Sequence, residues 1–183
     1  MIVGERIRLR APERSDLPDF VRWFNDPEVI ANLAMYAPMS LASEEQWFEG
    51  LLTQKDHYVF CIEVAVEADW RKVGNCGVDG ISWKNRHCSV GISIGEKAYW
   101  DQGVGTAALR LLVGWCFDEL GLNRVQLTVF ARNERAVRCY EKVGFRLEGT
   151  KRQALYRDGG FCDVHLMSIL QEEWRAGAGN PPA

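Results

Sequence analysis

The sequence predicts one α/β domain built around a mixed β-sheet, and two observations lead to this prediction. Stretches with strand periodicity alternate with helical ones, in the order strand, two helices, three strands, helix, strand, helix, two strands. The 183 residues suffice for one substantial core and contain no repeat or linker. We therefore assign residues 1–172 to a single domain and expect a flexible tail over 173–183, which is rich in small residues and proline.

The N-terminal elements are a strand over 6–9 and two helices. A helix over 13–24 has Ser15 as its expected cap, because a serine oxygen can accept a bond from the unsatisfied N–H groups of a first turn. The second helix is expected to have Ser43 as its cap and Gln46 in the capping-box position. The side chains predicted to face inward from it are Trp47, Leu51 and Leu52.

Turn signals delimit the remaining elements. The expected strands are 57–66, 72–83, 87–95, 124–130, 145–156 and 161–170, and the expected helices are 106–120 and 133–143. Gly121 and Gly144 suit the C-caps of these two helices, since glycine readily adopts the left-handed conformation that ends a helix. The sequence RDGG between the last two strands predicts a tight hairpin turn.

The composition is that of a globular protein without a strong surface charge. Hydrophobic residues make up 47% of the chain and charged ones 26%, and the formal net charge of −3 argues against nucleic acid as the main partner. No apolar run approaches the roughly 18 residues of a membrane helix, and no signal peptide is visible, so we expect a cytoplasmic protein without a membrane partner. The six cysteines and three histidines lack metal-ligand spacing, which predicts free thiols and no metal.

The stretch GVGTAA at 103–108 precedes the apolar helix and admits several interpretations. It satisfies the loose dinucleotide pattern G-x-G-x-x-G/A, but EKAYWDQ separates it from the preceding strand, and no P-loop Gly-Lys-Ser/Thr follows. The N–H groups of residues 102–106 would point out of a first helical turn, where a pyrophosphate can approach because residues 103 and 105 lack side chains. The alternative is simply a tight entry into a buried helix.

A second motif lies on the short helix over 133–143. Asn133, Ala136, Val137 and Tyr140 are spaced to share one helical face. By itself, such an asparagine is commonly a plain N-cap, and a tyrosine at this spacing is commonly a core residue. Paired with the glycine loop upstream, the two polar side chains indicate a ligand site.

These stretches resemble the GCN5-related N-acetyltransferases (GNAT), particularly their RimJ/RimL-like branch. The resemblance lies in GISIGEKAYWDQGVGTAALRLL, in NERAVRCYEKVGF and in the ending LEGTKRQALYRDGGFCDVHLMSIL. It implies the GNAT fold, a mixed and mostly antiparallel sheet of about seven strands flanked by about four helices. It also implies an enzyme that moves an acetyl group from acetyl-CoA to a primary amine, with no metal.

The resemblance also assigns roles to particular residues. Pantetheine would pair with the backbone of Ile92, Ser93 and Ile94. The pyrophosphate would bind the amides of Gln102, Gly103, Val104, Gly105 and Thr106, although Trp100 stands where relatives often carry Arg or Gln. Asn133 would bind the pantetheine arm, and Arg138 would reach the adenosine phosphates. An amide from Ser93 or Ile94 would bind the oxyanion, and Tyr140 would protonate the leaving sulfur.

The general base and the acceptor are left open by the residues. Ser89 stands where many relatives have a glutamate, so Glu63 and Asp79 are candidate bases, or else ordinary strand-edge carboxylates. The acidic residues that would attract a cationic amine, or merely lie exposed, are Asp26, Glu28, Glu44, Glu45 and Glu49. Aromatic side chains that would line an acceptor groove, or fill core, are Trp23, Tyr36, Trp47, Trp83 and Tyr156.

Several functions remain open at this level. The acceptor is expected to be a protein N-terminal amine or a small-molecule amine, and a polyamine of the spermidine type is the alternative. A non-catalytic acyl-CoA-binding module and a larger donor such as succinyl-CoA are further alternatives. A homodimer is possible, although no apolar stripe demands one.

Overall fold

Residues 1–178 are described by the computed structural model, and the chain divides into two units. Unit 1 comprises Met1–Gly80 and Gly91–Leu112, and unit 2 comprises Ile81–Val90 and Val113–Ala183. The division passes through two strands and the central helix, so each of these three elements contributes residues to both units. The expectation of a single domain over 1–172 concerns the two units together and stays a prediction.

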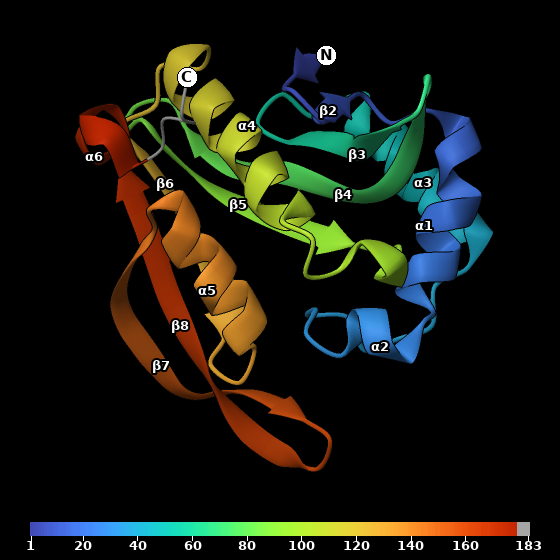
Figure 1. Ribbon diagram of the computed structural model, residues 1–183. Coiled ribbons are helices and arrows are strands. Elements are labelled where there is room, and N and C mark those ends of the chain that lie inside the picture. The colour runs from blue at the N-terminus through green and yellow to red at the C-terminus, as the bar shows by residue number, and fades with distance from the viewer. Residues whose placement is uncertain (179–183) are drawn as a thin grey trace. The chain divides into compact units, whose positions relative to one another are not determined.

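Unit 1 holds the N-terminal strands and helices (Figure 1). Its strands are β1 (Ile2–Val3), β2 (Ile7–Arg10), β3 (Tyr58–Val66), most of β4 (Asp69–Ser82) and the end of β5 (His87–Ile94). Its helices are α1 (Leu17–Phe24), α2 (Pro27–Ile30), α3 (Leu41–Leu51) and the first half of α4 (Val104–Asp118). The buried side chains of its helical core are Leu17, Phe20, Trp23, Val29, Phe48 and Cys61.

The starts of two helices differ from the sequence prediction. Ser15 lies inside a short 3-10 turn, Arg14–Asp16, and it is Asp16 that accepts a bond from the backbone N–H of Glu13. Ser40, three residues before the predicted cap, is the N-cap of α3, and it exchanges bonds with Ser43 in a capping box. Sequence alone cannot rank two capping residues that are spaced so that either can begin a helix.

The earlier start of α3 coincides with a different buried face. Glu44 and Phe48 are the buried residues of this helix, whereas Leu52 is 70% exposed and Trp47 only partly buried. The inward face predicted for Leu52 is therefore wrong. The residues Glu44 and Phe48 are four apart and lie on one side of the helix, as helical spacing requires.

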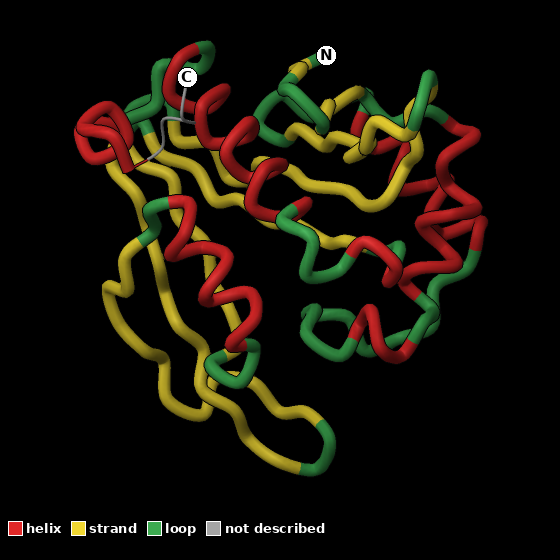
Figure 2. Tube along the Cα trace, viewed as in Figure 1, coloured by secondary structure: helices red, strands yellow, loops and turns green. Residues whose placement is uncertain are grey.

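Unit 2 contains the C-terminal elements. These are β6 (Arg124–Phe130), α5 (Glu134–Val143), β7 (Arg146–Arg157), β8 (Gly160–Leu170), α6 (Gln171–Glu173) and a turn at Trp174–Ala178. The long strands β7 and β8 form the predicted hairpin (Figure 2). Asp158 and Gly159 at its tip both have positive φ angles, 53° and 79°, as a tight two-residue turn requires. The predicted C-cap Gly144 is also confirmed, because it ends α5 with a φ angle of 113°. Gly121, with a φ angle of 63°, lies three residues beyond the end of α4 at Asp118.

The strands hydrogen-bond in the order β1-β2-β3-β4-β5-β6-β8-β7. Strands β5 and β6 pair in parallel. The antiparallel pairs are β1–β2, β2–β3, β3–β4, β6–β8 and β7–β8. The predicted mixed, mostly antiparallel sheet is confirmed. Within residues 1–178 the sheet has eight strands, and the strand beyond the predicted seven is the two-residue β1. The two helices beyond the predicted four are the short α2 and α6.

The expected flexible tail over 173–183 begins with residues of defined conformation. The ring of Trp174 lies 6.1 Å from the ring of Phe117, and Arg146 forms an ion pair with Glu173 at 2.7 Å. Residues 173–178 therefore form part of unit 2. Residues 179–183 lie outside the described part of the chain.

Candidate active site

The glycine loop before α4 bends twice at residues with left-handed backbone. Asp101 and Gly103 have φ angles of 59° and 79°, and they flank Gln102. The first turn of α4 closes with a bond from the Ala107 N–H to the Gly103 carbonyl at 3.0 Å. The N–H groups of a first helical turn have no acceptor within their helix, and the pyrophosphate role of residues 102–106 stays a prediction.

Gly103 has space where a side chain would be. A Cβ atom built on it would meet no other atom within 4 Å. The absence of a side chain here is thus not explained by packing within the described protein, and the positive φ supplies the conformational reason for glycine. Both properties suit a loop that a ligand approaches closely.

Trp100 ties this loop to the end of β5. Its indole Nε1 donates a hydrogen bond to the carbonyl of Ile94 at 2.8 Å. Trp100, at the position where relatives often carry Arg or Gln, therefore forms a structural hydrogen bond within unit 1. This bond occupies one acceptor site on the carbonyl oxygen of Ile94. The N–H groups of Gly95 and Glu96 bond to the Val73 carbonyl at 2.9 and 3.0 Å, which fixes the chain just after the strand.

The predicted pantetheine strand, Ile92–Ile94, lies against β4. A Cβ atom on Gly74 would come within 2.2 Å of the Ser93 carbonyl oxygen, so only glycine permits this approach. On the other side, the pairing of β5 with β6 covers His87–Ser89 and ends there, although β6 continues to Phe130 alongside β8. Ser93 itself is half-buried.

In unit 2, helix α5 carries the three other predicted residues. The Oδ1 atom of Asn133 caps the helix by accepting a bond from the Ala136 N–H at 3.2 Å, which leaves its NH2 group as a donor. The guanidinium of Arg138 is exposed and pairs with Glu134 at 3.1 Å. Tyr140 is instead buried, with 8% of its surface exposed. Asn133 and Tyr140 are therefore partly or fully buried, whereas the side chain of Arg138 is exposed to solvent.

The phenol of Tyr140 is held in its protonated form. Burial raises the pKa of Tyr140 well above its ordinary value, with a smaller contribution from Cys139. Its ring packs edge-on against Phe145, at 6.0 Å between centroids. A phenol is neutral at pH 7 with or without this shift and can donate a proton, whereas the raised pKa makes it a weaker acid.

The two candidate bases are not supported by their surroundings. Glu63 is 5% exposed, and Arg10 binds it at 2.7 Å while Arg8 binds its other oxygen. Asp79 is mostly exposed and lies 3.2 Å from the Nδ1 atom of His57. Glu63 is therefore neither a solvated edge residue nor a poised base, and Asp79 fits the ordinary exposed reading. At the position of the missing glutamate, the Oγ atom of Ser89 accepts a long hydrogen bond of 3.4 Å from the Nε2 atom of Gln126.

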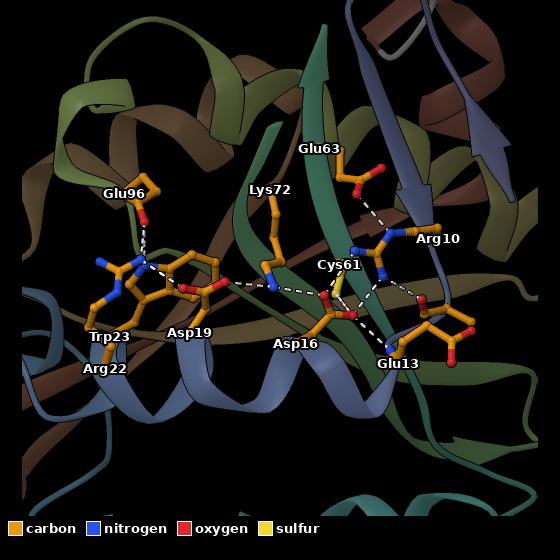
Figure 3. Close-up of polar contacts among 11 residues, drawn as sticks. Arg10, Glu13, Asp16, Asp19, Arg22, Trp23, Cys61, Glu63, Lys72 and Glu96 are labelled. Atoms are coloured by element: carbon orange, nitrogen blue, oxygen red, sulfur yellow. Dashed lines mark hydrogen bonds and ion pairs between the residues drawn. The ribbon is translucent and has the colours of Figure 1, made fainter. Parts of the chain in front are cut away.

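A continuous chain of ion pairs runs through unit 1 and was missed by the sequence analysis (Figure 3). Asp16, which is 3% exposed, binds Arg10 and Lys72 at 2.7 Å each, and Lys72 also binds Asp19 at 2.7 Å. Burial disfavours the charge on Asp16, but the bonds from Arg10 and Lys72 outweigh it and hold the pKa of that carboxyl well below its ordinary value. No local pattern reveals such partners, because they come from separate strands and helices.

Most of the acidic residues suggested for attracting an amine have cationic partners. Lys97 binds Asp26 at 2.9 Å and Glu28 at 3.0 Å, and Arg14 pairs with Glu49. Glu44 differs from them because it is 3% exposed, and burial raises its pKa to about 7. Of the aromatic set, Trp23 is buried core, whereas Tyr36 and Tyr156 are 92% and 64% exposed.

Among residues 1–178, no group of three or more His, Cys, Asp or Glu side chains is arranged to hold a metal ion. No helix in the same part of the chain has the length and apolar character needed to cross a membrane. All six cysteines are free.

Comparison with known proteins gives a consistent result. The profile of the Acetyltransferase (GNAT) domain family matches residues 6–146. The chain is 28% identical over 168 residues to the L-amino acid N-acetyltransferase AaaT of Escherichia coli, covering 90% of this chain and 98% of that protein. It is 29% identical over 176 residues to the spermidine N(1)-acetyltransferase of E. coli, covering 93% and 89%.

Solved structures agree at the level of the fold. The spermidine N-acetyltransferase of Vibrio cholerae, in complex with CoA and spermine, superposes with a TM-score of 0.87 at 23% identity, covering 94% of this chain and 99% of that one. The fold and the family profile together define an acyltransferase of the α/β class. This chain belongs to the GNAT acetyltransferase family, and it is an N-acetyltransferase.

Proposed function

We propose that this enzyme transfers the acetyl group of acetyl-CoA to a primary amine by direct attack in a ternary complex. The observation that carries the proposal is the loop at Asp101–Gly103, where two residues with positive φ lead directly into the first turn of α4. Amides of Gln102, Gly103, Val104, Gly105 and Thr106 hold the pyrophosphate, aided by the positive end of the helix dipole.

The remaining parts of the donor have their own partners in this proposal. Backbone groups of Ile92, Ser93 and Ile94 pair with the pantetheine amides, in the manner of a strand added to a sheet. The NH2 group of Asn133 donates to the same arm. Arg138 reaches the adenosine phosphates after its ion pair with Glu134 breaks. Breaking this pair costs little free energy, because both side chains are exposed on the surface.

The reaction needs one proton donor and one proton acceptor. The amine nitrogen attacks the thioester carbonyl carbon, the amide of Ser93 stabilises the oxyanion, and the C–S bond then breaks. Tyr140 donates its proton to the leaving sulfur, since a tyrosine phenol is protonated at neutral pH. An ammonium with a pKa of about 10.4 must first lose a proton to solvent water, which costs about 4 kcal/mol near pH 7.4. After the attack the nitrogen loses a second proton, and this proton restores the phenol of Tyr140 by way of solvent.

The acceptor is a protein N-terminal amine or a small-molecule amine. A polyamine is the second candidate, and it is favoured by the similarity to the two spermidine acetyltransferases over most of their lengths. Measuring CoA release with a peptide N-terminus, L-amino acids, spermidine and an amino sugar separates these classes. Acetyl-CoA and succinyl-CoA are compared as donors in the same assay.

Tyr140→Phe tests the catalytic part of the proposal. We expect kcat to fall about 100-fold, because general acid catalysis contributes on this scale, with little change in acetyl-CoA affinity. Calorimetry and CoA release measure the two quantities. If the wild-type protein and Y140F both bind acetyl-CoA and neither turns over any amine, the protein is a non-catalytic acyl-CoA-binding module instead.

Gly103→Val tests the loop, and the chain supplies a matched control. Gly103 and Gly159 both have a φ of 79° and open space around a built Cβ, so valine strains both backbones alike. We expect G103V to weaken acetyl-CoA binding at least tenfold and G159V to leave it unchanged. Equal affinities of the two variants would contradict the assignment of the loop.

A cytoplasmic location and a homodimer belong to the same proposal. The free state of all six thiols supports a reducing compartment. The exposed edge strand β7 supports self-association, since its first nine residues are all exposed.

A further inference from the structure

The turn at Gly95 and Glu96 joins the two segments that the proposed function assigns to acetyl-CoA. Residues 92–94, at the end of β5, precede this turn, and residues 102–106 follow it within unit 1. In the proposed reaction the first segment supplies the oxyanion donor, the amide of Ser93, and the second holds the pyrophosphate. The position of the thioester relative to Ser93 therefore depends on how firmly the turn is held.

Helix α1 packs directly on this turn through Trp23. A Cβ atom built on Gly95 would lie 2.1 Å from the Cδ2 atom and 2.2 Å from the Cγ atom of Trp23, so the indole rests on the bare Cα atom of the glycine. Trp23 is 2% exposed and belongs to the helical core of unit 1, where close packing leaves it little room to move aside. Close contact therefore explains the glycine at residue 95, whose φ angle is not positive.

A hydrogen bond joins the same ring to the next residue of the turn. The indole Nε1 atom of Trp23 donates to the Oε1 atom of Glu96 at 2.9 Å, and Arg22 pairs with the same oxygen (Figure 3). Burial works against the charge on Glu96, but the bonds from Arg22 and Trp23 outweigh it and hold the pKa of this carboxyl below its ordinary value. The acceptor is thus a carboxylate at neutral pH, and the bond from the indole is charge-assisted.

Strand β4 holds the backbone of the turn from its other side. The N–H groups of Gly95 and Glu96 both bond to the carbonyl oxygen of Val73, at 2.9 and 3.0 Å. Because the two donors meet at one oxygen atom, these bonds alone define a pivot rather than a fixed orientation. The contact and the hydrogen bond from Trp23 supply the second point of attachment, which fixes the direction in which the chain leaves β5.

We propose that Trp23 is a positioning residue for acetyl transfer, which acts through Gly95 and Glu96 on the orientation of Ser93. The inference rests on the proposed function and adds to it a residue outside the segments that bind acetyl-CoA. Trp23 touches neither reactant. It sets the placement of the Ser93 amide against the thioester carbonyl, where an error of about 1 Å can lower the rate about 100-fold.

Steady-state kinetics test this role, with acetyl-CoA and whichever of the peptide N-terminus, L-amino acids, spermidine and amino sugar the wild-type protein turns over fastest. The variants are Trp23→Phe, which keeps a buried ring without the N–H group, and Glu96→Ala, which removes the acceptor. Both are assayed under conditions where urea titration shows folded protein. We expect each to lower kcat about tenfold or more, with the KM for acetyl-CoA changed less than about threefold.

Further variants separate positioning from a loss of stability. Glu96→Gln retains an oxygen that can accept from the indole and should recover most of kcat. Trp70→Phe removes an indole elsewhere in unit 1, where the ring lies under Arg8, and should leave kcat unchanged. The double variant W23F/E96A should lose no more kcat than the larger single loss, because both changes break the same bond. Additive losses, or a kcat within about twofold of the wild-type value in both W23F and E96A, would overturn the inference.

Amide hydrogen exchange distinguishes these outcomes from a failure of the proposed function, because it needs no amine. The peptide covering residues 92–96 is followed in the wild-type protein, W23F and W70F. We expect its exchange to become about tenfold faster or more in W23F alone, since the turn loses its second attachment. Faster exchange in a protein that turns over no amine would refute acetyl transfer and retain the contact of Trp23 as the element that fixes the turn. Unchanged exchange in W23F would overturn the inference, whatever the turnover.

Discussion

Asp16 and Glu44 are carboxylates of unit 1 with equal exposure, 3% each, and opposite electrostatic settings. Asp16 is bound by Arg10 and Lys72, and these bonds overcome burial and hold its pKa below the ordinary value. Glu44 has no such partner, and burial raises its pKa to about 7. Partners, rather than burial, therefore decide in which direction the pKa of a buried acid shifts.

The largest expected effect follows from breaking the paired side of this comparison. Asp16→Asn leaves Arg10 and Lys72 without their shared buried anion, and we expect a loss of about 3–5 kcal/mol in the free energy of unfolding. Denaturant titration measures it. Asp19→Asn is the control, since the Asp19 side chain is 38% exposed and should cost about 1 kcal/mol or less. A cost below about 1 kcal/mol for D16N would show that the network does not stabilise the fold.

The substitution Lys72→Met is expected to lower the free energy of unfolding by a smaller amount. This substitution removes one cation but leaves Arg10 on Asp16 and Arg22 on Asp19, so we expect about 1.5–3 kcal/mol. The double variant D16N/K72M should lose less than the sum of the two single losses, because both act on the same bond. Strict additivity in this double-mutant cycle would contradict the coupling seen in Figure 3.

The pH dependence of stability should separate the two acids. Because the pKa of Glu44 is raised on folding, its favourable contribution is complete below the ordinary value of about 4.5 and is lost as the pH rises through about 7. E44Q, which does not titrate, should equal the wild-type protein near pH 4.5. Its free energy of unfolding should exceed that of the wild-type protein by about 3 kcal/mol above pH 7.5. A constant difference at all pH values would contradict a titrating Glu44.

Asp16 should show the opposite dependence. Its pKa is lowered on folding, so its contribution is present above the ordinary aspartate pKa of about 4 and is lost as the pH falls further. Urea titrations of wild-type protein and D16N from about pH 2 to 8 measure this, and the two curves should converge only at the acid end.

The smallest effect is expected at an exposed pair. Glu134→Gln removes the partner of Arg138 on the surface of α5, where both side chains are well solvated. We expect a change within about 0.5 kcal/mol in the free energy of unfolding. A change larger than about 1 kcal/mol would mean that Glu134 has a structural role beyond this pair.

The elements that the sequence predicted best are bounded by strong local signals. The strand at Arg124–Phe130 and the helix from Asn133 to Gly144 appear as expected, because an asparagine cap and a glycine with positive φ act within a few residues. The start of α3 was misplaced because Ser40 and Ser43 are both competent caps. The predicted roles of the site residues stay predictions, and the structure adds that Gly103 has a positive φ and that Tyr140 is buried.

The order of strands and helices, their turns and the family motifs could be read from the chain alone, because hydrophobic periodicity, capping and left-handed glycines depend on near neighbours. The burial and the ionic partners of each charged side chain could not be predicted from the chain alone. Glu63 was expected at a solvated edge and is buried between two arginines, whereas Glu44 was one of five similar acids and is the buried one among them. Electrostatic environment depends on which distant segments meet, and only the folded chain decides that.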